Sequence, residues 1–335
     1  MTTEVADRDG RTITSPGQFL GEVVAAGQPL ILRGLVAHWP VVAKATPAAL
    51  RDYLSGFGPG TVMETFVGPP EIRGKYFYGA DLKGNNFERR TLRLGEALDQ
   101  MVRTLDDPAS PTLYAGSLTL DEHLPGFAAE NAMPLLPPGV AGRIWLGHAS
   151  TVATHYDAFE NLACVVAGQR RFTLYPPAAV GDLYVGPIDN TLSGQPISLA
   201  ASDPDNPAYP RFQAVRDQAL VADLEPGDAL FLPKLWWHQV EATAPFNGLV
   251  NYWWDAFATG PDAPFTSLLL AMITMAERPA AERQAWRAFF DHYVFRPEGH
   301  PLAHLPAEQH GVLGPLKAGN YGRIRARVMQ LLRGG

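Results

Sequence analysis

Thr154-His155-Tyr156-Asp157 is the stretch around which this 335-residue chain is organised. In an extended strand, side chains two residues apart point to the same face, so His155 and Asp157 can present an imidazole nitrogen and a carboxylate oxygen to one point. We expect His238, in the Trp-Trp-His segment 236–238, to supply a second imidazole from a neighbouring strand. Two histidines and one carboxylate on one face of a metal ion leave its other positions open, which is the ligand set of non-haem Fe(II) oxygenases.

The His-x-Asp pair alone is a weak signal. With 9 histidines and 34 acidic residues in 335 positions, a histidine two residues before an acid is expected by chance. The alternative is a solvent-exposed strand face that carries both side chains without a metal. The segments before and after the pair therefore have to decide between the two interpretations.

The composition describes a globular protein with a sizeable core, because 46% of the residues are hydrophobic and 18% are charged. The 30 prolines and 32 glycines are spread along the chain, which favours many short strands and turns over a helical bundle. The net charge is −7, and no dense Lys/Arg run indicates a surface for nucleic acid or for an anionic membrane.

The sequence predicts a cytoplasmic protein. Residues 1–10 are acidic and carry no apolar segment, so we expect no signal peptide, and the longest apolar stretch, 268–276, is too short to span a bilayer. The single cysteine, Cys164, excludes an internal disulfide and fits a reducing compartment. It lies in the apolar run 162–166, which predicts a buried, unreactive thiol.

Short β-prone runs separated by turn residues dominate from residue 112 to residue 257. The predicted strands are 113–117, 143–148, 152–157, 162–166, 171–175, 219–223, 229–232, 239–243 and 248–254. Such a series folds as a sandwich or a barrel. A long loop, 176–216, interrupts it, and a connection of this length commonly forms a lid or a substrate-binding element.

The first third of the chain is predicted to be mixed α and β. Capping signals and apolar periodicity predict helices at 15–26, 46–54 and 92–105 and strands at 29–33, 61–67 and 76–78. A solvated surface is expected for a group of polar side chains that could alternatively line a cleft, namely Arg73, Lys75, Tyr76, Tyr78 and Asn86. No linker separates this part from the strand series, so residues 1–257 are predicted to form one decorated β domain.

Residues 264–335 are predicted to be helical. Apolar side chains form two stripes, one made of Trp286, Phe289, Phe290 and Tyr293 and one made of Ile324, Val328, Leu331 and Leu332. These faces require a partner surface. The alternatives are packing on the β domain and a homodimer formed through the helices.

Several motifs in order resemble the cupin-like JmjC family of Fe(II)- and 2-oxoglutarate-dependent oxygenases, which includes asparaginyl hydroxylases. The motifs are His155-Tyr156-Asp157, Asn161, Gly168-Gln169-Arg170-Arg171-Phe172, Tyr175-Pro176-Pro177, Pro226-Gly227-Asp228, Trp236-Trp237-His238 and Val250-Asn251-Tyr252-Trp253-Trp254. The resemblance implies a mainly β, double-stranded β-helix (jelly-roll or cupin) fold with its core at about 113–257. It also implies flanking N-terminal α/β elements and a C-terminal helical extension that mediates dimerisation.

The resemblance also implies the site residues and the chemistry. His155, Asp157 and His238 match the iron ligands, Asn161 and Asn251 match polar residues beside the metal and the cosubstrate, and Tyr114 resembles a tyrosine that contacts the cosubstrate carboxylate. The cofactors would be Fe(II), 2-oxoglutarate and dioxygen, and the reaction would hydroxylate a C–H bond, most simply of a protein side chain or an amino-acid-like substrate, with release of succinate and CO2.

Arg170 departs from the family pattern, because the relatives place a lysine there that pairs with the distal carboxylate of 2-oxoglutarate. A guanidinium binds a carboxylate through two parallel hydrogen bonds, so arginine keeps the positive charge that the lysine supplies. Its length and planar shape differ from those of lysine, so the geometry of binding differs. This departure keeps a second class open, a non-catalytic cupin that binds a metal or a small molecule. A nickel or zinc cupin isomerase is a third option.

Overall fold

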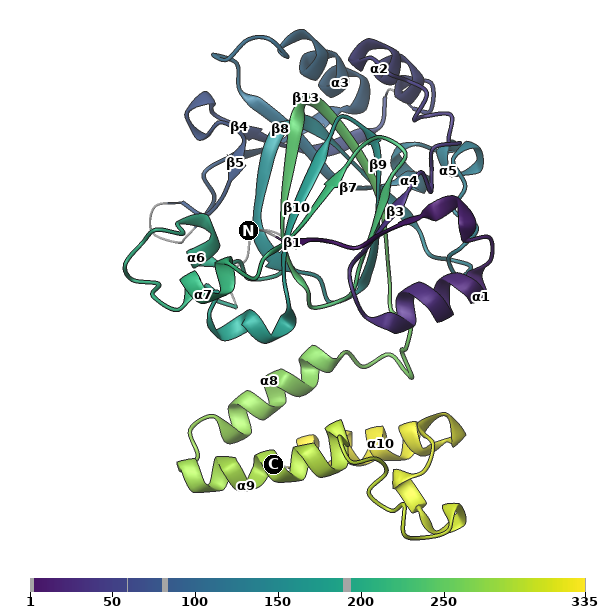
Figure 1. The fold of residues 1–335 in the computed structure, drawn as a ribbon, viewed down its shortest axis with the longest axis vertical. Helices are drawn as coiled ribbons and strands as arrows, with labels where there is room; N and C mark the ends of the chain where they lie inside the picture. The colour runs from purple at the N-terminus through teal and green to yellow at the C-terminus, as the bar shows by residue number, and fades with distance from the viewer. Residues whose placement is uncertain (1–2, 59, 80–83, 189–193, 335) are drawn as a thin grey trace. The chain divides into compact units, whose positions relative to one another are not determined.

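The computed structural model describes residues 3–58, 60–79, 84–188 and 194–334. The chain divides into two compact units, Met1–Ala256 and Phe257–Gly335 (Figure 1). Among the described residues, no helix is long and apolar enough to cross a membrane.

Unit 1 is built on a sheet of 13 strands, which confirms the predicted mainly β fold. The strands are β1 (Thr3–Glu4), β2 (Asp7–Asp9), β3 (Leu30–Arg33), β4 (Val62–Gly68), β5 (Lys75–Tyr76), β6 (Glu88–Arg93), β7 (Thr112–Thr119), β8 (Gly142–Tyr156), β9 (Glu160–Ala167), β10 (Arg170–Tyr175), β11 (Leu220–Leu224), β12 (Ala229–Leu232) and β13 (Trp237–Trp254). Side chains that alternate between the two faces of these strands supply most of the buried core.

The strands β8 and β13 run antiparallel along almost their whole length and form the spine of the unit. Each replaces two shorter predicted strands, so the predicted breaks at 149–151 and 244–247 are wrong. Register shifts between Ala242 and Phe246 bend β13 without ending it, because a β-bulge inserts residues into a ladder that then continues. The first half of β13 pairs with β10 and the second half with β9, so this one strand contributes to both halves of the fold.

The helices of unit 1 are short. They are α1 (Pro16–Gln18), α2 (Pro47–Ser55), α3 (Leu94–Arg103), α4 (Leu120–His123), α5 (Phe127–Glu130), α6 (Leu199–Ser202) and α7 (Phe212–Arg216). Ser15 and Thr46 accept the backbone N–H groups of Gln18 and Ala49, as the capping signals predicted. The helix predicted over 15–26 is irregular, because α1 continues as one π turn and one 3-10 turn up to Gly27.

The segment predicted as the loop 176–216 contains structure of its own. A 3-10 turn, α6 and α7 pack through buried side chains that include Leu183, Ala200 and Phe212. Residues 189–193 of this segment lie outside the described residues. Cys164 is buried in β9, as predicted, and burial raises the pKa of its thiol well above the usual range.

Unit 2 is helical, as the sequence predicted, with α8 (Pro264–Met275), α9 (Ala280–Phe290) and α10 (Asn320–Arg333). A short turn joins α8 to α9, and a longer segment, 291–319, with one π turn and several 3-10 turns connects α9 to α10. Large apolar side chains of its helices are exposed: Ile273 is 82% exposed, Leu331 is 59% exposed and Leu332 is 57% exposed. Among the described residues of this unit, no large hydrophobic side chain is buried. The assignment of residues 264–335 as a C-terminal extension separate from the β domain stays a prediction, and so does its role in forming a dimer.

Asp228 joins the tight turn before β12 to β3. Its carboxylate accepts hydrogen bonds from the Arg33 guanidinium at 2.7 Å and from the backbone N–H groups of Gly34 and Glu225 at 2.9 and 3.3 Å. We expect Asp228→Ala to lower the free energy of unfolding by about 2 kcal/mol, since it leaves the backbone N–H groups of Gly34 and Glu225 without their acceptor and removes one partner of Arg33. Asp223→Ala is the control, because it removes an exposed pair with Arg171 and should cost less than about 1 kcal/mol. Urea titration measures the free energy of unfolding of both variants. Equal losses would contradict the role of Asp228 in joining the turn to β3.

Candidate metal centre and its cavity

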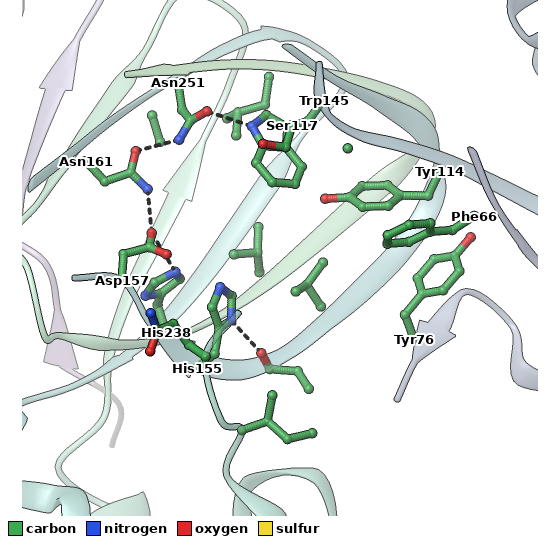
Figure 2. A pocket seen from close by; sticks show the side chains of 18 of the residues that line it. Phe66, Tyr76, Tyr114, Ser117, Trp145, His155, Asp157, Asn161, His238 and Asn251 are labelled. Carbon is green, nitrogen blue, oxygen red and sulfur yellow. Dashed lines mark hydrogen bonds and ion pairs between the residues drawn. The ribbon is translucent and has the colours of Figure 1, made fainter. Parts of the chain in front are cut away.

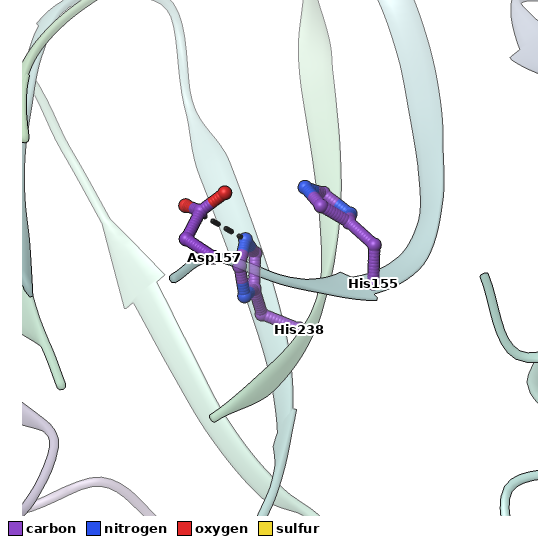
Figure 3. Close-up of side chains that lie close together, drawn as sticks. All are labelled: His155, Asp157 and His238. Atoms are coloured by element: carbon purple, nitrogen blue, oxygen red, sulfur yellow. Dashed lines mark ion pairs between the residues drawn. The ribbon is translucent and has the colours of Figure 1, made fainter. Parts of the chain in front are cut away.

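His155 and His238 face each other across the β8–β13 ladder. They are paired in register, and their ring centroids are 4.3 Å apart. Figure 3 shows the two rings and the Asp157 carboxylate gathered at one point. One ligand atom from each of the three residues lies within 4.8 Å of the others, so the structure brings the three predicted ligands together.

The backbone selects the tautomer of both imidazoles. Nδ1 of His155 lies 2.8 Å from the carbonyl oxygen of Ala153, and Nδ1 of His238 lies 3.0 Å from that of Trp236. A carbonyl oxygen only accepts hydrogen bonds, so each Nδ1 carries the proton and each Nε2 keeps a lone pair. This is the arrangement that metal-ligating histidines show, and it fits a metal ion.

His238 is buried, and desolvation lowers the pKa of its imidazole, with the neighbouring His155 ring acting in the same direction. The Asp157 carboxylate opposes the shift but does not cancel it; its Oδ2 lies 3.7 Å from Nε2 of His238. A neutral imidazole is the form that binds a metal, so burial prepares His238 as a ligand.

The turn that carries His238 is tied to the strand end that carries Asp157. The backbone N–H of Leu235 donates to the carbonyl oxygen of Asp157 at 2.8 Å, with Leu235 held in the left-handed region at φ 67°. Lys234 is held beside it by ion pairs of 2.8 Å to Asp255 and 3.3 Å to Glu160. The ligands of the two strands are therefore linked through the backbone as well as through the ladder.

The predicted amides lie beside the metal centre. Asn161 donates to Oδ2 of Asp157 at 3.2 Å, and Asn251 donates to Oδ1 of Asn161 at 3.1 Å. Trp145 donates to Oδ1 of Asn251 at 2.7 Å, and Trp253 donates to Oδ2 of Asp157 at 3.0 Å. Asn251 and Trp253 both line the cavity, as their common strand parity predicted.

The three ligands open into a cavity of about 330 Å³ that also contains Arg170 and Tyr114 (Figure 2). Arg170 is 3% exposed, and its Nε has no hydrogen-bond partner. Among the described residues, no carboxylate pairs with its guanidinium, and burial lowers its pKa. A buried cation without an anion is costly, so the site fits an acidic ligand such as 2-oxoglutarate.

Burial raises the pKa of the Tyr114 phenol to about 12, and the nearby Arg170 guanidinium opposes this shift without cancelling it. The phenol therefore stays protonated at neutral pH and is available as a hydrogen-bond donor. Gly147 makes room for this ring, because a Cβ there would lie 3.2 Å from the ring and 2.7 Å from the Leu113 carbonyl oxygen.

Several cavity residues were not predicted from the sequence. An aromatic wall adjoins Tyr114, with Phe66 stacked on Phe87 at 4.6 Å and Tyr76 at 5.6 Å from Tyr114. Tyr76 is buried and lines the cavity, so the expected solvated surface is wrong for this residue and the alternative of a cleft-lining side chain holds. The further lining residues that were missed are Glu64, Arg89, Ser117, Trp145 and Gln195.

Four aromatic residues near the motifs differ in how far they are buried. Trp236 and Trp237 are buried in the core, and Tyr156 packs on Trp237 with ring centroids 4.9 Å apart. Phe159 is 48% exposed. None of these four side chains lines the described cavity, so they do not form its wall.

The family model described as a cupin-like domain matches residues 16–260. The chain belongs to this cupin-like family. The match confirms the jelly-roll fold and the resemblance to JmjC proteins that the motifs indicated.

Curated relatives of this cupin-like chain include three proteins of similar identity. It is 28% identical over 248 residues to "Jumonji C domain-containing protein 5" of Drosophila melanogaster, covering 71% of the chain and 57% of the relative. It is 26% identical over 272 residues to the human "Bifunctional peptidase and (3S)-lysyl hydroxylase JMJD7", covering 72% and 81%. It is 23% identical over 245 residues to "Lysine-specific demethylase 8" of Xenopus tropicalis, covering 71% and 50%. The chain thus spans about half the length of the fly and frog relatives.

Arg170 provides a direct test of the cavity. We expect Arg170→Met to raise the free energy of unfolding of the ligand-free protein by about 1 kcal/mol, because an unpaired buried charge is replaced by an apolar chain. The same change should abolish the rise in melting temperature that 2-oxoglutarate gives the wild type.

Arg171→Met is the matched control, because this neighbouring arginine is exposed and paired with Asp223 at 2.7 Å. Arg171→Met should change neither the free energy of unfolding nor the rise in melting temperature with 2-oxoglutarate by much. If 2-oxoglutarate stabilises the Arg170→Met protein as strongly as the wild type, the acid binds elsewhere.

Proposed function

We propose that this chain is an Fe(II)- and 2-oxoglutarate-dependent oxygenase that hydroxylates a C–H bond and releases succinate and CO2. One observation carries the proposal: a two-histidine, one-carboxylate cluster and an unpaired buried arginine face the same cavity. The first is a ligand set for iron and the second is an anchor for a dicarboxylate. The cupin-like family and relatives named as a hydroxylase and a demethylase support the same chemistry.

His155, Asp157 and His238 would hold the iron, each through one atom. When bound, the iron with 2-oxoglutarate and dioxygen supplies the oxidising power for attack on an unactivated C–H bond. The residues of the chain bind and orient. Both histidines keep their protons on Nδ1, where a backbone carbonyl accepts them, so Nε2 stays available.

Arg170 and Tyr114 would bind the distal carboxylate of 2-oxoglutarate. The guanidinium offers parallel N–H donors and the phenol offers an O–H donor. Phe172, Leu249 and Ala163 line the cavity beside them and exclude water from this end. A carboxylate in this dry setting gains more from the arginine than it would in water.

The substrate is proposed to be a protein side chain or an amino-acid-like molecule. Two relatives carry lysine in their names, so a lysyl side chain is the first to test. The cavity wall bears one exposed carboxylate, Glu64, which is paired with Arg89 at 2.8 Å. Gln195 and Ile197, from the segment after β10, also line the cavity, which supports a substrate-binding role for that segment.

The chain is also proposed to work in the cytoplasm. Its only cysteine is buried and therefore cannot pair with another chain or with an oxidant at the surface. Chains with this cysteine usage are typical of reducing compartments.

Turnover of 2-oxoglutarate tests the activity. Purified protein with Fe(II), ascorbate and air should convert 2-oxoglutarate to succinate even without substrate, and His155→Ala or Asp157→Ala should lower the rate by about 100-fold or more, since each removes a ligand itself. His38→Ala is the matched control, because this histidine is exposed and far from the motifs in sequence. Lysine-containing peptides would be scored by mass for the gain of one oxygen atom.

The outcome separates the three classes of protein. Neither turnover nor binding of 2-oxoglutarate would leave only a metal- or small-molecule-binding cupin. Conversion of a substrate without a change of mass and without dioxygen would indicate an isomerase.

Unit 2 is proposed to form a homodimer with the same unit of a second copy. Large apolar side chains are exposed on all three of its helices, among them Leu268, Trp286 and Leu332. Many exposed large apolar side chains on one unit indicate an interface, and most oligomers of a single chain are twofold symmetric.

Leu331 is the residue chosen to test the dimer. We expect Leu331→Glu to shift the mass measured by light scattering from dimer to monomer, because it places a charge on the apolar stripe of α10. Leu20→Glu is the control; this leucine is 45% exposed in unit 1 and its replacement should leave the mass unchanged. A wild-type monomer would refute the interface.

A further inference from the structure

Four side chains form a row of hydrogen bonds from the metal centre to the cavity wall. Trp145 donates to Asn251, Asn251 donates to Asn161, and Asn161 donates to Oδ2 of Asp157, over 2.7, 3.1 and 3.2 Å. Figure 2 shows these hydrogen bonds as a continuous row of dashed lines. Trp145 belongs to β8 and Asn251 to β13, so the row crosses the two strands that carry the ligands.

The two ends of this row fix its direction. The indole N–H of Trp145 can only donate, and the Asp157 carboxylate can only accept. An asparagine side chain offers an acceptor on one side and donors on the other, so each amide has one orientation that satisfies both neighbours. Asn251 is 2% exposed and Asn161 is 6% exposed, so water does not readily replace a lost partner.

We propose that Trp145 is a positioning residue for the metal centre, acting through Asn251 and Asn161. Its N–H holds the Asn251 amide so that both asparagines present donors toward Asp157. Without it, Oδ1 of Asn251 has no donor, and the inverted orientation would turn an oxygen of Asn161 toward the carboxylate. This inference rests on the proposed metal site and concerns the residues that support it.

The Asp157 carboxylate is held at one oxygen only. Asn161 and Trp253 both donate to Oδ2, and among the described residues no hydrogen bond reaches Oδ1. Two donors on one oxygen fix the rotation of the carboxylate beside the two histidines. Outer hydrogen bonds of this kind orient a ligand and typically change metal affinity 10- to 100-fold.

The side chain of Trp145 is held in the cavity wall by contacts with neighbouring rings. Its ring centroid is 5.8 Å from Trp253, edge to face, and 6.1 Å from Tyr114. Gly116 leaves room for it, because a Cβ there would lie 2.9 Å from the indole. The indole thus has a fixed position from which its N–H reaches Asn251.

The experiment measures Mn²⁺ binding to the purified protein by calorimetry, without cosubstrate or turnover. Trp145→Phe keeps an aromatic ring and removes the N–H, and we expect the Kd for Mn²⁺ to rise about 10-fold. In the Asn251→Ala background the same change should alter the Kd by less than about 2-fold, because the row is already broken.

Trp39→Phe is the matched control. Trp39 is buried, and its indole donates to the carbonyl oxygen of Ala132 at 3.0 Å, so the change removes a comparable bond away from the site. Its Kd for Mn²⁺ should equal that of the wild type. If Trp145→Phe does not fold, benzothienylalanine at position 145 keeps both rings, removes only the N–H and should show the same 10-fold effect.

Each outcome is decisive. An unchanged Kd in the folded variant at position 145, or the same loss with and without Asn251, overturns the positioning role while leaving the metal site intact. A wild-type protein that binds no Mn²⁺ overturns the metal site and the positioning role together.

Discussion

The antiparallel pairing of β8 with β13 is the constraint on which the centre depends. It places His155 opposite His238 and brings Asp157, just past the end of β8, within reach of both. A slip of one residue would turn every side chain of a strand to the other face, and the histidines would no longer meet. The buried apolar side chains of these strands, such as Ile144 and Val250, make such a slip expensive. The core thereby holds the register that the chemistry needs.

The interior of unit 1 separates two kinds of environment within one cavity. One end is polar and fully connected, from Asp157 through two amides to an indole. The other end holds Arg170 among aromatic and aliphatic side chains, with its charge unmatched. A satisfied network gives rigidity, whereas an unsatisfied charge gives affinity for an incoming acid. The same pocket is thus prepared for a cation on one side and for an anion on the other.

The sequence predicted the parts of the structure that local patterns encode. The mainly β fold, the three converging ligands and the amides Asn161 and Asn251 follow from strand parity and from motifs, and the structure brings these residues together. Trp145 and the aromatic wall around Phe66 were missed because their places depend on pairing between strands distant in sequence. The continuity of β8 and β13 was missed for a related reason, since a bulge looks like a break when only propensity is considered.

The two glycines beside the cavity have a consequence for how such a pocket changes during evolution. Gly116 on β7 and Gly147 on β8 leave bare backbone where the rings of Trp145 and Tyr114 lie. An added methyl group at Gly116 would have to displace the indole of Trp145, and one at Gly147 would meet the Leu113 carbonyl oxygen at 2.7 Å as well as the Tyr114 ring. The positions of these two rings therefore depend on residues without side chains, so a substitution at either glycine would change the shape of the cavity while the predicted ligands stay the same.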